Sequence, residues 1–212
     1  MTSSNKHGRF ITLEGGEGVG KSTQIKALSA VLRDRGLDVI ETREPGGTPG
    51  AEHIRQLLLH STADAWSPRA EALLFAAARS DHVERLIEPA LADGKWVLCD
   101  RFIDSTRAYQ GGGDGLSDAE IVTLHSIGSK GLLPDRTLLL TLDTDAVAAR
   151  RAARSLDQPD RFEDRQSDFH ADVIAAFDRM ANADSARFRR VSASGAPDDV
   201  TARLLDALAD LM

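Results

Sequence analysis

One short motif near the start of the chain limits what it can fold into. The pattern G-x-x-x-x-G-K-S/T is matched by Gly15-Gly16-Glu17-Gly18-Val19-Gly20-Lys21-Ser22, directly after the apolar stretch 10–13. The motif requires a buried strand before it and a helix after it, so we expect strand, loop and helix in that order. Its glycines let backbone N–H groups point inward around an anion, and the helix start adds a positive dipole end.

We expect this loop, together with the following Thr23, to bind the phosphates of a nucleoside triphosphate. Lys21 is expected to reach the β- and γ-phosphates, and the Ser22 hydroxyl is expected to bind Mg²⁺. The alternative is a glycine-rich turn that carries its lysine by chance, which the flanking segments disfavour. The motif by itself does not say which reaction the bound nucleotide undergoes.

The length and composition of the chain narrow the class of protein to which it can belong. The 212 residues are expected to form a single domain, residues 1–212, with a small inserted segment. The net charge of −7 argues against a nucleic-acid partner bound through bulk electrostatics. Cys99 is the single cysteine, and no segment has the roughly 20 apolar residues that span a bilayer. Residues 1–9 are polar and lack a signal-peptide core, so we expect a cytoplasmic protein without a membrane partner.

Apolar periodicity alternates between strand and helix along the chain. The expected strands are 10–13, 37–41, 96–100, 137–142 and 188–191. The expected helices are 23–35, 51–60, one from Pro68 onward, one around 83–87 that Pro89 kinks, 117–129, 169–180 and 198–212. This alternation predicts an α/β fold, a P-loop NTPase-type five-stranded parallel sheet with helices on both faces.

Ligands of such sheets bind at the carboxyl ends of the strands. We therefore expect four segments to converge on one crevice. They are 15–22, 43–48, 100–110 and the residues after Asp143.

Three segments besides the loop identify a family. They are Thr42-Arg43-Glu44-Pro45-Gly46-Gly47-Thr48, Leu73-Leu74-Phe75-Ala76-Ala77-Ala78-Arg79-Ser80-Asp81-His82, and Asp100-Arg101-Phe102-Ile103-Asp104-Ser105-Thr106-Arg107-Ala108-Tyr109-Gln110-Gly111-Gly112-Gly113. With the loop, they make the chain resemble the thymidylate kinase family over nearly its whole length. The resemblance implies that ATP phosphorylates dTMP to dTDP with Mg²⁺, in a homodimer.

The resemblance also assigns residues to the acceptor. Glu17, Glu44 and Pro45 would line its site, and Arg55 would bind the monophosphate, although Arg55 could also be an ordinary surface arginine. Ser105 and Gln110 would lie near the base. Tyr109 would pack where a ribose 2′-OH would sit and so select deoxyribose.

The reaction itself can be argued from chemistry. A nucleoside monophosphate is largely dianionic at pH 7, since its second pKa is about 6, so it needs no general base. Catalysis then consists of holding two anions in line and screening their repulsion. Arg101 could bridge the two phosphates, and Asp100 could organise the Mg²⁺ shell partly through water. The competing interpretation is an ion pair at the end of a strand.

Base selection has a physical interpretation as well. Phe75 and Arg79 are four residues apart and share a helix face, so a base could stack on Phe75 while Arg79 faces its edge. An arginine donor suits the O4 acceptor of thymine and opposes the amino group of cytosine. Periodicity alone also allows Phe75 as core and Arg79 as a solvated charge.

An arginine-rich stretch is expected to form a lid at about 150–168. Gly18, rather than arginine, follows Glu17, and by the resemblance this departure implies that the catalytic arginine lies in the lid, where Arg154 and Arg161 are the first choices. Such an arginine would act on the transferring phosphoryl group and the lid would exclude water. A solvated charged helix is the alternative.

Two other functions stay open at this point. One is a kinase for a different nucleoside monophosphate or for a deoxynucleoside, for which Glu17 or Asp100 would have to serve as the base. The other is a nucleotide-dependent switch, although the chain lacks the Asn-Lys-x-Asp segment by which a GTPase reads guanine.

Overall fold

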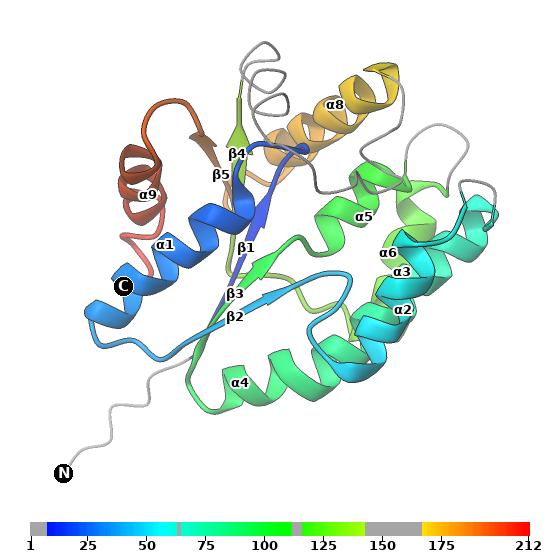
Figure 1. The fold of residues 1–212 in the computed structure, drawn as a ribbon, viewed down its shortest axis with the longest axis horizontal. Coiled ribbons are helices and arrows are strands. Elements are labelled where there is room, and N and C mark those ends of the chain that lie inside the picture. Colours follow the sequence, from blue (N-terminus) through cyan, green and yellow to red (C-terminus); the bar gives the residue numbers. More distant parts are fainter. Residues whose placement is uncertain (1–7, 63–64, 112–115, 143–166) are drawn as a thin grey trace.

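Five apolar segments pair as one parallel sheet in the order β2-β3-β1-β4-β5. The computed structural model describes residues 8–62, 65–111, 116–142 and 167–212 (Figure 1). The strands are β1 (Arg9–Glu14), β2 (Val39–Arg43), β3 (Trp96–Asp100), β4 (Arg136–Thr141) and β5 (Phe188–Ser192). The first strand lies at the centre, so the loop that follows it opens near the middle of the sheet.

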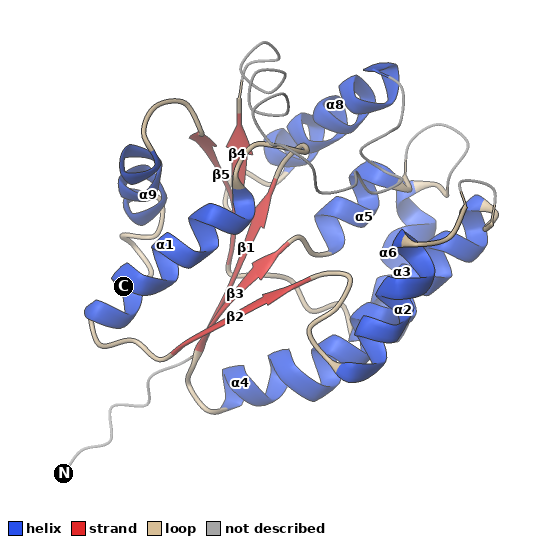
Figure 2. Cartoon of the chain, viewed as in Figure 1, coloured by secondary structure: helices blue, strands red, loops and turns tan. Residues whose placement is uncertain are grey.

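Both faces of the sheet are covered, which explains why the central strands are nearly continuous apolar runs. On one face, Ile11 and Leu13 of β1 pack in a core with the two helices α1 (Lys21–Asp34) and α9 (Pro197–Asp206). On the other face, Phe10 and its neighbours pack under the remaining helices. Figure 2 shows α1 and α9 together on one side of the strands and the other helices opposite.

Three of the described helices begin at side chains that cap their free N–H groups. Thr48 accepts from Ala51 N, Ser67 accepts from Ala70 N, and Ser117 forms a capping box with Glu120. The helices on this second face are α2 (Pro49–Leu59), α3 (Pro68–His82), the π-helical turn η1 (Val83–Ile87), α4 (Glu88–Ala92), α5 (Ile103–Tyr109), α6 (Asp118–Ser129) and α8 (Ser167–Ala183).

The predicted fold class is confirmed, while many element bounds differ by one to three residues and three segments differ in ways that have a structural reason. The second strand was expected at 37–41 and occupies Val39–Arg43, because its hydrogen-bonded register with β3 continues to the pair Arg43↔Asp100. The last helix was expected to continue to 212 but ends at Asp206. Beyond it, Leu208 N and Leu211 N donate to carbonyls three residues earlier, so the chain tightens into turns. The segment around 83–92 is η1 followed by α4, and Pro89 lies in the first turn of α4.

Candidate active site

The phosphate-binding loop joins β1 to α1. Gly15 has φ 134°, and a Cβ there would lie 2.5 Å from the carbonyl oxygen of Leu140, so only glycine fits beside β4. Gly20 is the left-handed N-cap of α1, and no side chain caps that helix. The first N–H groups of α1 therefore stay available to an anion.

Lys21 lies folded over this loop. Its ammonium donates to the carbonyl oxygens of Gly15 at 3.1 Å and Gly16 at 2.8 Å, and the residue is buried. Burial, followed by the positive charge of Arg101, lowers its pKa to about 8. Phosphate anions beside the ammonium would favour its charged form.

Ser22 and Asp100 fit a Mg²⁺ site. The Ser22 hydroxyl donates to Oδ2 of Asp100 at 2.7 Å, while Oδ1 of Asp100 is buried without a donor from any described residue. A hydroxyl beside a carboxylate oxygen without a donor is the hard oxygen set that Mg²⁺ prefers. Within the described ranges, no three His, Cys, Asp or Glu side chains could hold a metal together. Phosphates and water would therefore have to complete the shell.

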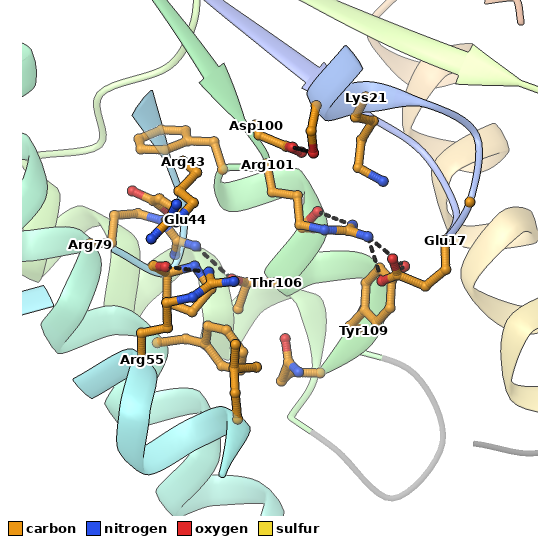
Figure 3. Close-up of a pocket in the computed structure, with 18 of the residues that line it drawn as sticks. Glu17, Lys21, Arg43, Glu44, Arg55, Arg79, Asp100, Arg101, Thr106 and Tyr109 are labelled. Carbon is orange, nitrogen blue, oxygen red and sulfur yellow. Dashed lines mark hydrogen bonds and ion pairs between the residues drawn. The ribbon is translucent and has the colours of Figure 1, made fainter. Parts of the chain in front are cut away.

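Arg101 follows β3 in a left-handed conformation, with φ 67°. Its guanidinium forms an ion pair with Glu17 at 2.5 Å, donates to the Tyr109 hydroxyl at 3.2 Å and lies over the Tyr109 ring, 4.9 Å from the centroid. It also donates to Gly15 O at 3.3 Å. Arg101 thus lies between the phosphate-binding loop and α5, as Figure 3 shows.

The buried carboxyl group of Glu14 supports this turn. Glu14, the last residue of β1, accepts from Phe102 N at 2.8 Å and from the Ser105 hydroxyl at 2.5 Å. Burial, and then the charge of Asp104, raises the pKa of Glu14 to about 8. Both bonds hold the chain just after Arg101, and Arg101 N itself donates to the carbonyl oxygen of Leu13 at 3.0 Å, which explains how a non-glycine residue keeps the left-handed conformation there.

The second group of polar side chains lies across the pocket. Arg79 donates from Nε to Glu44 at 2.7 Å and from Nη2 to the Thr106 hydroxyl at 2.6 Å, and it is 3% exposed. The interpretation of Arg79 as a solvated charge is therefore wrong. Arg55 donates to the carbonyl oxygen of Pro45 at 2.7 Å. Figure 3 shows Arg55, Glu44 and Arg79 on the opposite side from Glu17 and Lys21.

One cavity of about 340 Å³ connects the two groups. Sixteen predicted residues line it: Glu17, Gly18, Gly20, Lys21, Ser22, Thr23, Glu44, Pro45, Arg55, Phe75, Arg79, Asp100, Arg101, Ser105, Tyr109 and Gln110. Three others do not, because the backbone of Gly15 and Gly16 faces Lys21 and the Val19 side chain packs in the core. Arg154 and Arg161 lie outside the described residues.

Four residues that line the cavity were not named individually, namely Arg43, Leu59, Phe102 and Thr106, although all but Leu59 lie in segments expected at the crevice. For Phe102 and Thr106 the sequence did contain a signal. Residues 102, 105, 106, 109 and 110 have the spacing of one helix face, and all five line the cavity from α5 or its two ends. The sequence segment was interpreted only as part of a crevice and not as a helix, so Phe102 and Thr106 were missed.

Sheet order and phosphate-binding loop together define a P-loop nucleotide-binding protein of the α/β class. Comparison with known proteins narrows this to one family. The thymidylate kinase family model matches residues 13–204. A thymidylate kinase of Rhizorhabdus wittichii is 62% identical over 97% of this chain and 99% of its own length. A thymidylate kinase of Bradyrhizobium diazoefficiens is 48% identical over 98% of this chain and 91% of its own length.

A solved structure agrees with the sequence relatives. The crystal structure of thymidylate kinase from Ehrlichia chaffeensis superposes with a TM-score of 0.76 at 30% identity, covering 95% of this chain and 98% of that one. The chain belongs to the thymidylate kinase family. This family converts dTMP to dTDP with ATP as the phosphoryl donor, so its members are nucleoside monophosphate kinases.

Proposed function

We propose that this chain transfers the γ-phosphoryl group of ATP to dTMP at the cavity described above. ATP lies on the phosphate-binding loop, with Lys21 beside its phosphates, and dTMP lies between α3 and α5. The observation that carries the proposal is the pairing of a phosphate-binding loop with a second, arginine-lined group of residues across one cavity.

Two arginines have distinct roles in this proposal. Arg101 bridges the donor and acceptor phosphates, which is supported by its place between the loop and α5. Arg55 binds the monophosphate from α2. Because the acceptor phosphate is already anionic, these charges screen repulsion and no proton has to be removed from it. A lid at 150–168, with Arg154 or Arg161 on the transferring group, completes the proposed single domain.

Residues on the other side of the cavity recognise the base and the sugar of dTMP. Thymine stacks on Phe75, and the guanidinium of Arg79 donates to its O4, with Ser105 and Gln110 close to the base. Two observations support the role of Arg79 in recognising the base. Arg79 lines the cavity, and its Nε and Nη2 are held by Glu44 and Thr106. Tyr109 packs against the deoxyribose and its hydroxyl bonds Glu17 at 3.2 Å.

Mg²⁺ is proposed at Ser22 and Asp100. This is supported by the donor-free Oδ1 of Asp100 beside the Ser22 hydroxyl. When bound, the ion neutralises phosphate charge. The protein side chains orient the phosphates around it: Lys21 on the donor and Arg101 between donor and acceptor.

A homodimer and a cytoplasmic location complete the proposal. Large apolar side chains are exposed on α2, α3 and α6, among them Leu57 at 50%, Leu73 at 54% and Ile127 at 76%. Such side chains favour burial against a second copy. No helix in the described part of the chain is long and apolar enough to cross a membrane. Cys99 is a free, buried thiol, which is compatible with a reducing compartment.

The test is the pair of variants Arg79→Ala and Lys21→Ala. Arg79→Ala should raise the KM for dTMP at least about tenfold while the KM for ATP stays within about twofold, since the lost bond is to the base. Lys21→Ala should abolish transfer while dTMP binding, measured by calorimetry, stays largely intact. Equal changes in both KM values for Arg79→Ala would remove it as the base reader.

A further inference from the structure

His82 is a fully buried histidine that the proposed reaction does not use. It is the last residue of α3, three positions after Arg79, and it does not line the cavity. Its ring contacts one side chain of β2 and one of the loop that follows β2. Nδ1 lies 3.0 Å from Oε1 of Glu44, and Nε2 lies 2.7 Å from the Thr42 hydroxyl of β2.

Glu44 stands between this histidine and the reader arginine. Its Oε1 lies within hydrogen-bond distance of Nδ1 of His82, and its Oε2 accepts a hydrogen bond from Nε of Arg79 at 2.7 Å. Burial opposes ionisation of Glu44, but the charge of Arg79 and the hydrogen bond from His82 outweigh it and lower its pKa below the usual value. An ionised carboxylate only accepts hydrogen bonds, so Nδ1 of His82 carries a proton and donates it.

Arg79 is oriented from two sides by these contacts. Nε is bound to Glu44 and Nη2 to Thr106, whereas Nη1 has no partner among the described residues. The direction of Nη1 therefore depends on how firmly both Glu44 and Thr106 are held. His82 is the other side-chain partner of Glu44, because each carboxylate oxygen has one described side-chain donor.

The loop after β2 packs closely against His82. Gly47 has φ +90°, and a Cβ there would lie 2.5 Å from both Nε2 of His82 and the Thr42 hydroxyl. Next to it, the Thr48 hydroxyl donates to Asp81 at 2.5 Å, so the loop is fixed to the end of α3 at adjacent positions. Only glycine at 47 leaves room for the bond between His82 and Thr42.

We infer that His82 is a positioning residue for base selection: by donating to Glu44, it fixes the carboxylate that orients Arg79 toward the acceptor base. The chain of contacts runs from Thr42 through His82 and Glu44 to Arg79. This inference rests on the proposed role of Arg79 and adds a specificity determinant outside the cavity.

Two near-isosteric variants separate positioning from packing. In His82→Asn the amide nitrogen replaces Nδ1 and can still donate to Glu44, while in His82→Gln the amide replaces Nε2 and reaches Thr42 instead. Steady-state kinetics with dTMP, dCMP and ATP would be measured for both, for His82→Ala and for Arg79→Ala, with a melting curve for each.

For His82→Gln and His82→Ala we expect the KM for dTMP to rise roughly tenfold and the preference for dTMP over dCMP to fall by a similar factor. His82→Asn should stay within about threefold of the parent, and the KM for ATP should stay within about twofold throughout. On an Arg79→Ala background, His82→Gln should add nothing to the KM for dTMP, because both act through one guanidinium.

Equal impairment of the Asn and Gln variants would overturn the inference, as would a parallel rise of both KM values. If His82→Ala does not fold, the comparison of His82→Asn with His82→Gln still tests the inference. The underlying proposal fails differently: an unchanged KM for dTMP in Arg79→Ala would remove Arg79 as the reader, whatever the His82 variants do.

Discussion

At the scale of single residues, the charge of Lys21 is tied to what occupies the phosphate-binding loop. The ammonium is buried, and burial together with the nearby Arg101 lowers its pKa to about 8. In the unfolded chain the pKa is the ordinary, higher one, so between the two values the unfolded state binds more protons and the stability contribution of Lys21 rises with pH. An anion in the loop reverses the shift, because it favours the charged form.

Nucleotide binding should therefore take up protons at pH 8. With MgATP and no acceptor, calorimetry in buffers of different ionisation enthalpy should give an uptake of about half a proton at pH 8 and close to none at pH 6.5. Lys21→Met should show no uptake at either pH. The same proton number for the parent and Lys21→Met at pH 8 would contradict the shifted pKa.

At the scale of helices and strands, α5 is the element that the sequence analysis did not predict, although it supplies several residues of the cavity. The strand–loop–helix start was predicted because its motif requires that context, and the five strands followed from apolar runs. The α5 face was missed because three of its five residues, Ser105, Thr106 and Gln110, are polar and the helix is short, so apolar periodicity gave only a weak signal. Its fixed position comes from distant residues, Glu14 on β1 and Arg187 before β5, which no local pattern reveals.

The contact that fixes the far side of α5 is a buried ion pair. Asp104 is fully buried, and Arg187 donates to both of its carboxylate oxygens, at 2.5 and 3.1 Å. Asp104→Ala should lower the free energy of unfolding by about 3–5 kcal/mol, because Nη1 and Nη2 of the buried Arg187 lose their carboxylate and only Nε keeps one, at Asp184. Urea unfolding would measure this.

Two further variants serve as comparisons for that pair. Replacing both partners, as in Asp104→Leu with Arg187→Met, should cost much less than Asp104→Ala alone, because no buried charge remains. Lys130→Ala breaks the exposed pair with Glu88 and should leave stability nearly unchanged. A double variant as unstable as Asp104→Ala would mean that packing, and not charge, dominates at this position.

At the scale of the whole molecule, the proposed dimer follows from exposed apolar side chains on α2, α3 and α6. Ile127→Asp should convert the dimer to a monomer in sedimentation velocity, because a charge on α6 would oppose burial at the interface. Ile174→Asp, on α8, is the matched control, since Ile174 is also exposed, at 45%, but lies on another helix. A dimer that survives Ile127→Asp but not Ile174→Asp would move the interface to α8.

The cavity is proposed to select dTMP as the phosphoryl acceptor. The most direct measurement is ADP release with MgATP, comparing dTMP, dUMP, dCMP, UMP, AMP, thymidine and no acceptor. We expect fast turnover with dTMP, much slower turnover with dCMP, and little without an acceptor, because Arg79 suits a base with an oxygen acceptor at its edge. Turnover mainly with another acceptor, or acceptor-independent hydrolysis alone, would contradict it.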